Sequence, residues 1–298
     1  MRLVTRGDLD GLACAVLLTS CEDVDEIQLA HPQDITDKRL HVDADDILAN
    51  LPYHPACGMW FDHHLLTASN EKPPEGFAGR HALAPSAARV IYDHYAGEHP
   101  ELDRFERLLE ETDRLDSARL SLDEVLNPQG YVLLGFTLDP RSGLGNWESY
   151  FLSLVELLKT SPIEEVLARP EVAERVERMR AQDAEFRRIT REHSRLEGNV
   201  VVSDFRGIEK PPVGNRFLVY TLYPEANVSL RVHRAPGPAH VAVAVGHSIF
   251  NRTSNTNVGE LMSRHNGGGH KGAGTCLLPA ADADRLIGEL IETLRSDG

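Results

Sequence analysis

The feature that most constrains the fold is a repeated pattern in the first half of the chain, where short apolar segments alternate with polar turns and helical segments. Segments with the length and composition of strands occupy residues 1–5, 26–30, 40–42 and 58–61. Segments with helical character occupy residues 12–20, 86–95 and 102–112. Alternation of strands and helices favours an α/β domain with a mostly parallel sheet.

The character of the chain changes after a highly charged stretch at residues 162–196, which we interpret as helices. Strand-like segments follow at residues 200–202, 217–222, 228–232 and 241–245, then a glycine-rich loop, then an amphipathic helix at 283–294. A length of 298 residues suits two domains. We therefore predict a parallel-sheet α/β domain over 1–190, joined by a helical linker to a smaller mixed-sheet α/β domain over 199–298.

Charge and cysteine usage exclude several classes of protein. With 31 Lys and Arg against 46 Asp and Glu, the net charge is −15, which argues against a duplex-DNA binder because such proteins need a basic face. No pair of cysteines has the C-x-x-C spacing of a zinc or redox motif, and the longest early apolar run is too short to span a bilayer. We expect a cytoplasmic protein with no membrane partner. A bound cation could still make the site attractive to an anion.

Carboxylates and histidines follow the predicted strands, where a parallel sheet binds its ligands. Asp8 and Asp10 follow the first strand, Asp43 the third and Asp62-His63-His64 the fourth, while Asp113 follows a helix. Taken alone, Asp8 and Asp10 could cap a helix, and Asp43 could belong to a turn. A carboxylate beside two imidazoles is harder to explain without a cation, because burying all three is costly.

The set of candidate ligands indicates which metal would bind. Carboxylate and imidazole groups without a thiolate suit manganese or magnesium. Two such ions, bridged by one carboxylate, could activate a hydroxide and clamp both oxygens of a phosphoryl displacement. One or two manganese or magnesium ions are therefore expected.

The ordered set of these segments resembles the DHH family of phosphoesterases. Thr5-Arg6-Gly7-Asp8-Leu9-Asp10-Gly11 resembles its first motif, Asp43 the second, Asp62-His63-His64 the third and Asp113 the fourth. Residues 266–274 resemble the glycine-rich signature of the DHH-associated C-terminal domain, so the match covers nearly the whole chain.

The resemblance implies a hydrolase of phosphoester or phosphoanhydride bonds, usually manganese-dependent. Members of the family include oligoribonucleases, 3′-phosphoadenosine-5′-phosphate phosphatases, cyclic-dinucleotide phosphodiesterases, single-strand exonucleases and exopolyphosphatase-like proteins. Carried over by position, Asp8 belongs to one metal and Asp10 to the other, and Asp43 bridges them. His63 and Asp113 complete the shell of the second metal.

Two residues are expected to act on the substrate. The resemblance places His64 opposite the substrate phosphate, as a donor or acid. Arg6 stands where the family usually has a histidine, and a guanidinium cannot ligate a cation. Arg6 could bind the phosphate directly, His31 could replace the missing ligand, or the site could hold one metal and be weak or inactive.

The second domain is expected to hold the substrate's phosphate. Successive glycines let the backbone approach an anion, although a plain glycine turn is the alternative. The candidate substrate-binding residues are Arg231, Arg252, Gly267, Gly268, Gly269 and His270. No run of aromatic and basic residues indicates a long single-strand platform. The expected substrate is a short phosphorylated nucleotide; polyphosphate hydrolysis, or a binding protein without turnover, is the alternative. The sequence is also compatible with a homodimer.

Overall fold

The computed structural model describes residues 1–66, 71–138, 145–209, 214–235 and 237–298. The chain forms two compact units. The first consists of Met1–Leu120 and Pro128–Met179, and the second of Ser121–Asn127 and Arg180–Gly298. The division falls within the long helix α9 (Pro170–His193), whereas the sequence places its domain boundary between residues 190 and 199.

The first unit is built on a five-stranded sheet. Its strands are β1 (Arg2–Thr5), β2 (Glu26–Leu29), β3 (Asp46–Ala49), β4 (Met59–Asp62) and β5 (Gly79–His81). They lie in the order β2-β1-β3-β4-β5, and every neighbouring pair is parallel. The predicted parallel α/β architecture is confirmed for this unit.

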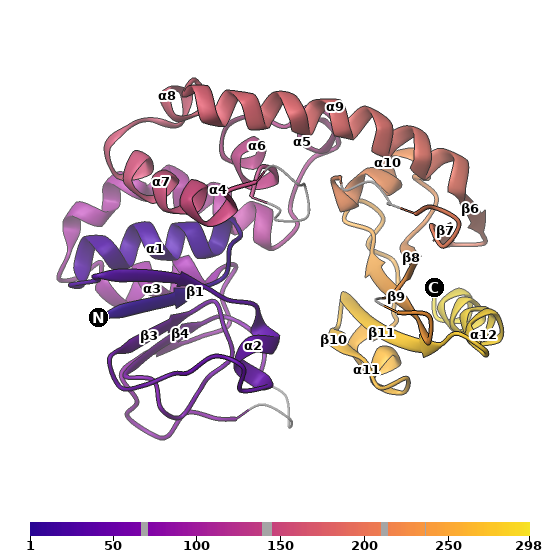
Figure 1. Cartoon of the computed structure of the whole chain (residues 1–298), viewed down its shortest axis with the longest axis horizontal. Helices are drawn as coiled ribbons and strands as arrows, with labels where there is room; N and C mark the ends of the chain where they lie inside the picture. The colour runs from indigo at the N-terminus through magenta and orange to yellow at the C-terminus, as the bar shows by residue number, and fades with distance from the viewer. Residues whose placement is uncertain (67–70, 139–144, 210–213, 236) are drawn as a thin grey trace. The chain divides into compact units, whose positions relative to one another are not determined.

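Helices bury one face of this sheet. The helical elements are α1 (Leu9–Cys21), α2 (Pro32–Thr36), α3 (Ala87–Tyr95), η1 (Pro100–Phe105), α4 (Glu106–Asp116), α6 (Gly130–Phe136), α7 (Trp147–Thr160) and α8 (Ile163–Leu167). Figure 1 shows α1, α4 and α7 on the same side of the sheet. Leu3, Ile47 and Phe61 point into that core, where α1 is buried along most of its length. A helix that is apolar on all sides is stable only in such a position.

The opposite face carries Val4, Leu48 and Trp60, with Trp60 donating from its indole nitrogen to the Leu51 carbonyl at 2.8 Å. The strand predicted at residues 40–42 is absent from the sheet, and β3 is formed instead by Asp46–Ala49. The pairing with β1 decides this, because β3 residues are buried on both faces and Asp46 forms an ion pair with Arg2 at 2.6 Å.

The second unit contains a mixed six-stranded sheet, as predicted. Its strands are β6 (Ser194–Glu197), β7 (Val200–Asp204), β8 (Val228–Arg234), β9 (His240–His247), β10 (Gly268–His270) and β11 (Ala273–Pro279). They lie in the order β10-β11-β9-β8-β7-β6, antiparallel except for the parallel pair β7 and β8.

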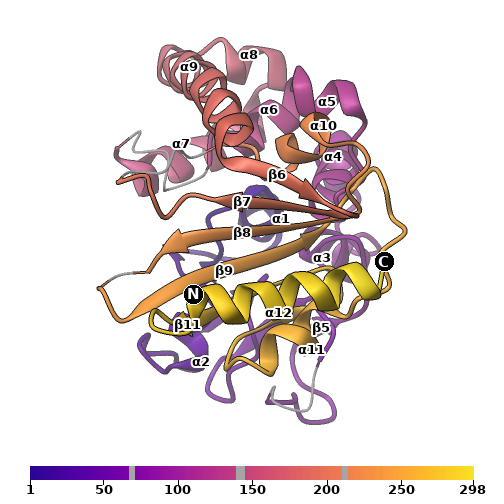
Figure 2. The same cartoon turned by 90° about the vertical axis from the view of Figure 1, so that its right-hand side faces the viewer.

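Two helices bury one face of this second sheet. The helical elements here, besides the end of α9, are α5 (Leu122–Leu126), η3 (Arg216–Leu218), α10 (Val219–Leu222), α11 (Val258–Ser263) and α12 (Ala283–Ser296). Figure 2 shows β7, β8 and β9 side by side, with α12 alongside them. Leu261 of α11 and Leu290 and Leu294 of α12 pack against the strand valines.

One predicted strand in this unit is helical. Residues 217–222 form the end of η3 and the whole of α10. The cause is local, because the Asn215 side chain accepts the Phe217 amide at 3.0 Å and begins a helical turn. Within the described part of the chain, no helix combines the length and the apolar character needed to cross a membrane.

Candidate active site

The strand order places one edge of the first sheet where a ligand is expected. After β1 the chain continues to β2 on one side of the sheet, and after β3 it continues to β4 on the other side. Open α/β sheets bind ligands at the carboxyl ends of two neighbouring strands whose connections diverge in this way. Asp8 follows β1 and Asn50 follows β3, and Asn50 Nδ2 donates to Asp8 Oδ1 at 3.1 Å. The backbone amide of Asn50 donates to Phe61 at 3.0 Å, which holds this residue at a φ of 57°.

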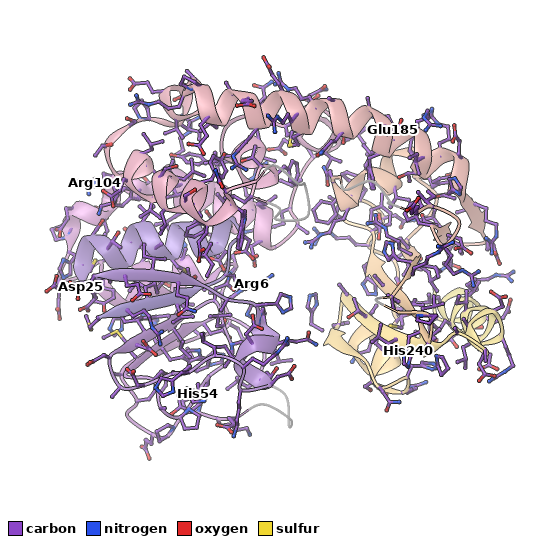
Figure 3. All side chains as sticks on the ribbon, viewed as in Figure 1. Arg6, Asp25, His54, Arg104, Glu185 and His240 are labelled. Atoms are coloured by element: carbon purple, nitrogen blue, oxygen red, sulfur yellow. The ribbon has the colours of Figure 1, made fainter. Side chains whose placement is uncertain are left out.

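Asp8 has a partner at each of its carboxylate oxygens. Oδ1 also accepts the Gly11 amide at 2.9 Å, so Asp8 caps α1 as the local pattern allowed. Oδ2 lies 3.1 Å from a terminal nitrogen of Arg6, which stands at the carboxyl end of β1 (Figure 3). The Arg6 side chain is one third exposed (33%), so its guanidinium is fixed by Asp8 but still accessible.

Asp10 is fully buried inside the unit. Its Oδ2 accepts the Ala87 amide and its Oδ1 the Ala88 amide, both at 2.9 Å, so this carboxylate closes the amino end of α3. Burial and the nearby charge of Asp8 raise the pKa of Asp10 to about 7, although the two amides lower it. A divalent cation beside Asp10 would favour its charged form and offset this cost of burial.

His63 is oriented as a ligand. Its Nδ1 lies 3.0 Å from the Ala84 carbonyl, to which it must donate, and this leaves the lone pair on Nε2. Nε2 is buried and has no hydrogen-bond partner among the described residues. It lies 3.4 Å from Asp116 Oδ2 and 3.7 Å from Asp10 Oδ2. Three acceptors that face one another need a cation between them.

Asp116 completes this group at the end of α4. Burial and the charge of Asp10 raise its pKa to about 7. One ligand atom from each of Asp10, His63 and Asp116 lies within 4.8 Å of the others, a donor set of two oxygens and one nitrogen that fits a divalent cation. Asn50 Oδ1 is a second buried acceptor without a partner among the described residues, which also indicates a ligand here.

His64 lies beside this group as a proton donor. Its Nδ1 is 2.8 Å from Asp62 Oδ1, and its own carbonyl lies 2.8 Å from His81 Nε2. Burial lowers the pKa of His64, but the hydrogen bond and charge of Asp62 raise it more, so the net shift is upward. Because Asp62 fixes Nδ1, Nε2 is the nitrogen free to exchange a proton with a ligand.

Likenesses to known proteins come from solved structures. No family model and no curated protein sequence matches the chain. Among solved structures, the DHH domain of a protein from a family of ribosomal proteins has a TM-score of 0.63 at 12% identity, over 99% of this chain and 86% of that one. RecJ from Thermus thermophilus, solved with Mn²⁺, has a TM-score of 0.55 at 16% identity, over 94% and 50%.

A much stronger likeness joins the chain to the pGpG-specific phosphodiesterase PggH from Vibrio cholerae. The identity is 39%, the TM-score is 0.80, and the match covers 100% of this chain and 99% of that one. The chain belongs to the DHH family of phosphoesterases. As a member of this family it is a hydrolase.

Two residues predicted for this DHH centre lie elsewhere. Asp43 is exposed and precedes β3, at the edge of the sheet where Arg2 pairs with Asp46, so the structure does not bring it to the cluster. Asp113 accepts from Ser86 Oγ at 2.6 Å and from Arg89 Nε at 2.9 Å, and thereby braces α4 against α3. The geometry does not support a bridging role for Asp43 or a ligand role for Asp113.

Asn50 lies beside Asp8, and Asp116 lies beside His63. Both left a signal in the sequence, since Asn50 ends the apolar run at 47–49 and Asp116 lies one helical turn beyond Asp113. His31 caps α2 through Nδ1, which accepts the Gln33 amide at 3.3 Å, and its side chain is exposed. The structure therefore gives no support to His31 as a replacement ligand.

The predicted substrate residues of the second unit gather on its hairpin and sheet. A Cβ at Gly267 would lie 2.1 Å from the Thr275 carbonyl and one at Gly269 would lie 2.2 Å from the Ala273 carbonyl, so hairpin packing requires these two glycines. A Cβ at Gly268 would meet nothing within 4 Å, and Gly268 is exposed. Packing therefore does not explain the glycine at this position.

The remaining predicted substrate residues lie on β8, on a loop and at the hairpin tip. The Arg231 guanidinium lies 5.5 Å from the ring centre of Phe186 and 5.8 Å from that of Phe205. Arg252 donates from Nε to the Ile249 carbonyl at 3.0 Å, and exposed His270 ends β10 and accepts the Gly272 amide at 3.3 Å. None of the predicted substrate residues lines the described cavity of about 1100 Å³, whose walls include Arg206, Arg234 and His240.

Proposed function

We propose that this phosphoesterase hydrolyses a short linear dinucleotide of the pGpG type, with manganese or magnesium held by Asp10, His63 and Asp116. Water would cleave the internal phosphodiester, leaving the phosphate on one nucleotide and a hydroxyl on the other. The full-length likeness to a pGpG-specific enzyme at 39% identity supports the choice of substrate. The buried His63 Nε2, unpaired among the described residues and facing two carboxylates, is the observation that carries the reaction.

The bound cation would lower the pKa of a water molecule and neutralise charge that develops on the phosphoryl group. The protein's own groups prepare the centre. The amides of Ala87 and Ala88 orient Asp10, and the Ala84 carbonyl orients His63. Two of the three ligands are therefore fixed before a substrate arrives, which reduces the reorganisation needed for the reaction.

Arg6 and His64 would act on the substrate itself. The Arg6 guanidinium is held by Asp8 and partly exposed, so its remaining N–H groups can bind two phosphate oxygens as a fork. His64, polarised by Asp62, would donate a proton from Nε2 to the leaving oxygen. We place recognition of the rest of the substrate on Gly268, His270, Arg231 and Arg252 of the second unit, by the family resemblance.

The compartment is part of the proposal. All four cysteines are free, and two of them are buried as small apolar side chains. A chain of this length without a disulfide is typical of a reducing compartment, so we place the enzyme in the cytosol.

The test is hydrolysis of pGpG by the purified chain with Mn²⁺, with product mononucleotide measured by chromatography. Asp10→Asn and Asp116→Asn should each lower kcat/KM by at least about a hundredfold, a barrier change of about 2.7 kcal/mol. Asp43→Asn is the matched control, because it alters an exposed aspartate near the amino ends of the same strands. Its kcat/KM should stay within about twofold of wild type.

Two results would contradict the proposal. Absence of pGpG hydrolysis with either Mn²⁺ or Mg²⁺ would refute the activity. Cleavage of short polyphosphate with no cleavage of pGpG would refute the substrate while leaving the metal centre in place.

A further inference from the structure

We propose that the centre binds one divalent cation per chain, and that Arg6, anchored by Asp8, supplies the positive charge that a second cation would otherwise bring. This inference rests on the proposed function, because it concerns the same centre. It assigns Arg6 to phosphate binding, with Asp8 as the carboxylate that holds Arg6 and Asn50 as a hydrogen-bond donor to Asp8.

The first argument comes from the partners of Asp8. Its carboxylate offers about four acceptor positions, and three positively polarised groups already lie against it. The Gly11 amide lies at 2.9 Å, Asn50 Nδ2 at 3.1 Å and Arg6 Nη2 at 3.1 Å. Two N–H groups donate to Asp8 and a guanidinium charge faces it, so a cation arriving there would have to displace or oppose them.

The second argument concerns Asn50. It directly follows β3, beside β1, where a carboxylate would have added both a ligand and a negative charge. Instead an amide donates to Asp8, and the backbone bond to Phe61 and a φ of 57° fix its position. Asn50 therefore orients Asp8 toward Arg6 and contributes no charge to hold a metal.

The third argument is the balance of charge. Asp8, Asp10 and Asp116 carry three negative charges when ionised, Arg6 carries one positive charge, and Asp62 is paired with His64, which donates the proton. One divalent cation neutralises the remainder, with His63 as a neutral ligand. A second would leave a net charge of about two positive units in a partly buried site beside a guanidinium, an arrangement that desolvation penalises.

The contrast with the other carboxylates points to where the one ion binds. Asp10 and Asp116 face the lone pair of His63 Nε2 at 3.7 and 3.4 Å, and among the described residues neither forms an ion pair with a lysine or an arginine. Asp8 faces Arg6. One subsite therefore lacks a positive group, and the other already has one.

The experiment is a Mn²⁺ titration by calorimetry on the metal-free full chain, with metal content after gel filtration as an independent count. No substrate is needed, so the readout is independent of turnover. Wild type should bind about one Mn²⁺ per chain. Asp8→Asn, which keeps a helix-capping side chain, should also bind about one, while Asp116→Asn should lower Mn²⁺ affinity at least about tenfold.

A gain-of-site variant sharpens the test. Arg6→His with Asn50→Asp removes the guanidinium and supplies two ligands beside Asp8, so it should bind about two Mn²⁺ per chain. Two ions bound by wild type, or loss of an ion in Asp8→Asn, would overturn this inference even if hydrolysis of pGpG is intact. A wild-type chain that binds no Mn²⁺ and cleaves no phosphodiester would overturn the proposed function itself.

Discussion

Asp113 and Asp116 lie three residues apart on α4, and we expect their removal to have opposite consequences. Asp113→Ala removes a 2.6 Å hydrogen bond from Ser86 and a 2.8 Å ion pair with Arg89, whose side chain is only 25% exposed. Bonds to a charged group contribute about 1.5–3 kcal/mol each, so the loss should be about 3 kcal/mol. For a unit of this size that corresponds to a fall in Tm of roughly 6–12 °C.

Asp116→Ala should leave the metal-free protein as stable as wild type, or more stable. Burial raises the pKa of Asp116 to about 7, so at pH 8 its charge destabilises the metal-free fold. Removing that charge should stabilise by up to about 2 kcal/mol, since the full shift would be worth about 4 kcal/mol and Asp10 shares the penalty. Activity should nevertheless fall at least about a hundredfold.

Urea unfolding with a chelator present, followed by circular dichroism, measures both free energies, and pGpG hydrolysis well below each Tm measures activity. Asp113→Ala should keep kcat within about tenfold of wild type, because its partners brace two helices and do not touch the cluster. The reasoning is refuted if Asp116→Ala is destabilised by more than about 2 kcal/mol while remaining active.

Three further outcomes are expected. Arg6→Ala should lower kcat/KM by roughly tenfold to a hundredfold and Arg6→Lys by less, both with unchanged Mn²⁺ affinity by calorimetry; wild-type kinetics in Arg6→Ala would exclude phosphate binding. Gly268→Val should raise KM for pGpG at unchanged Tm, whereas Gly269→Ala should lower Tm because its Cβ would meet a backbone oxygen at 2.2 Å; unchanged kinetics in Gly268→Val would remove the hairpin from substrate binding. Because burial raises the pKa of Asp10 and Asp116 to about 7, the folded state still binds protons that the unfolded state has released, so metal-free stability should fall by about 1–3 kcal/mol from pH 6 to pH 8. Urea unfolding at both values tests this, and saturating Mn²⁺ should abolish the fall.

The fold class could be predicted because periodic signals survive in the sequence. Alternating strands and helices indicated the parallel sheet of the first unit, and the valine-rich segments indicated the mixed sheet of the second. Asp8, Asp10 and His63 were placed together by a rule of position, since each follows a strand whose carboxyl end meets the same edge.

Local pattern alone does not choose between Asp43 and Asn50, because each follows a short apolar segment. Residues 40–42 and 46–49 are both short and apolar, and only the pairing of β3 with β1, helped by Asp46 and Arg2, selects the second. The sequence analysis placed this strand six residues too early. It therefore assigned Asp43 to the carboxyl end of the strand, where the structure has Asn50.

The choice between Asp113 and Asp116 depends on contacts from another element. Both are aspartates near the end of α4, and Ser86 and Arg89 at the start of α3 bind the first. Asp116 instead faces His63. No periodicity in the sequence of one helix reports which residues another helix will present to it.

The central claim is that Asp10, His63 and Asp116 hold the divalent cation, and anomalous diffraction from a crystal grown with Mn²⁺ tests it most directly. The account predicts one anomalous peak per chain, in contact with His63 Nε2 and with a carboxylate oxygen of both Asp10 and Asp116. A peak bound through Asp8 with His63 uncoordinated, or a crystal of protein that is active in solution with Mn²⁺ yet shows no ion at His63, would contradict it.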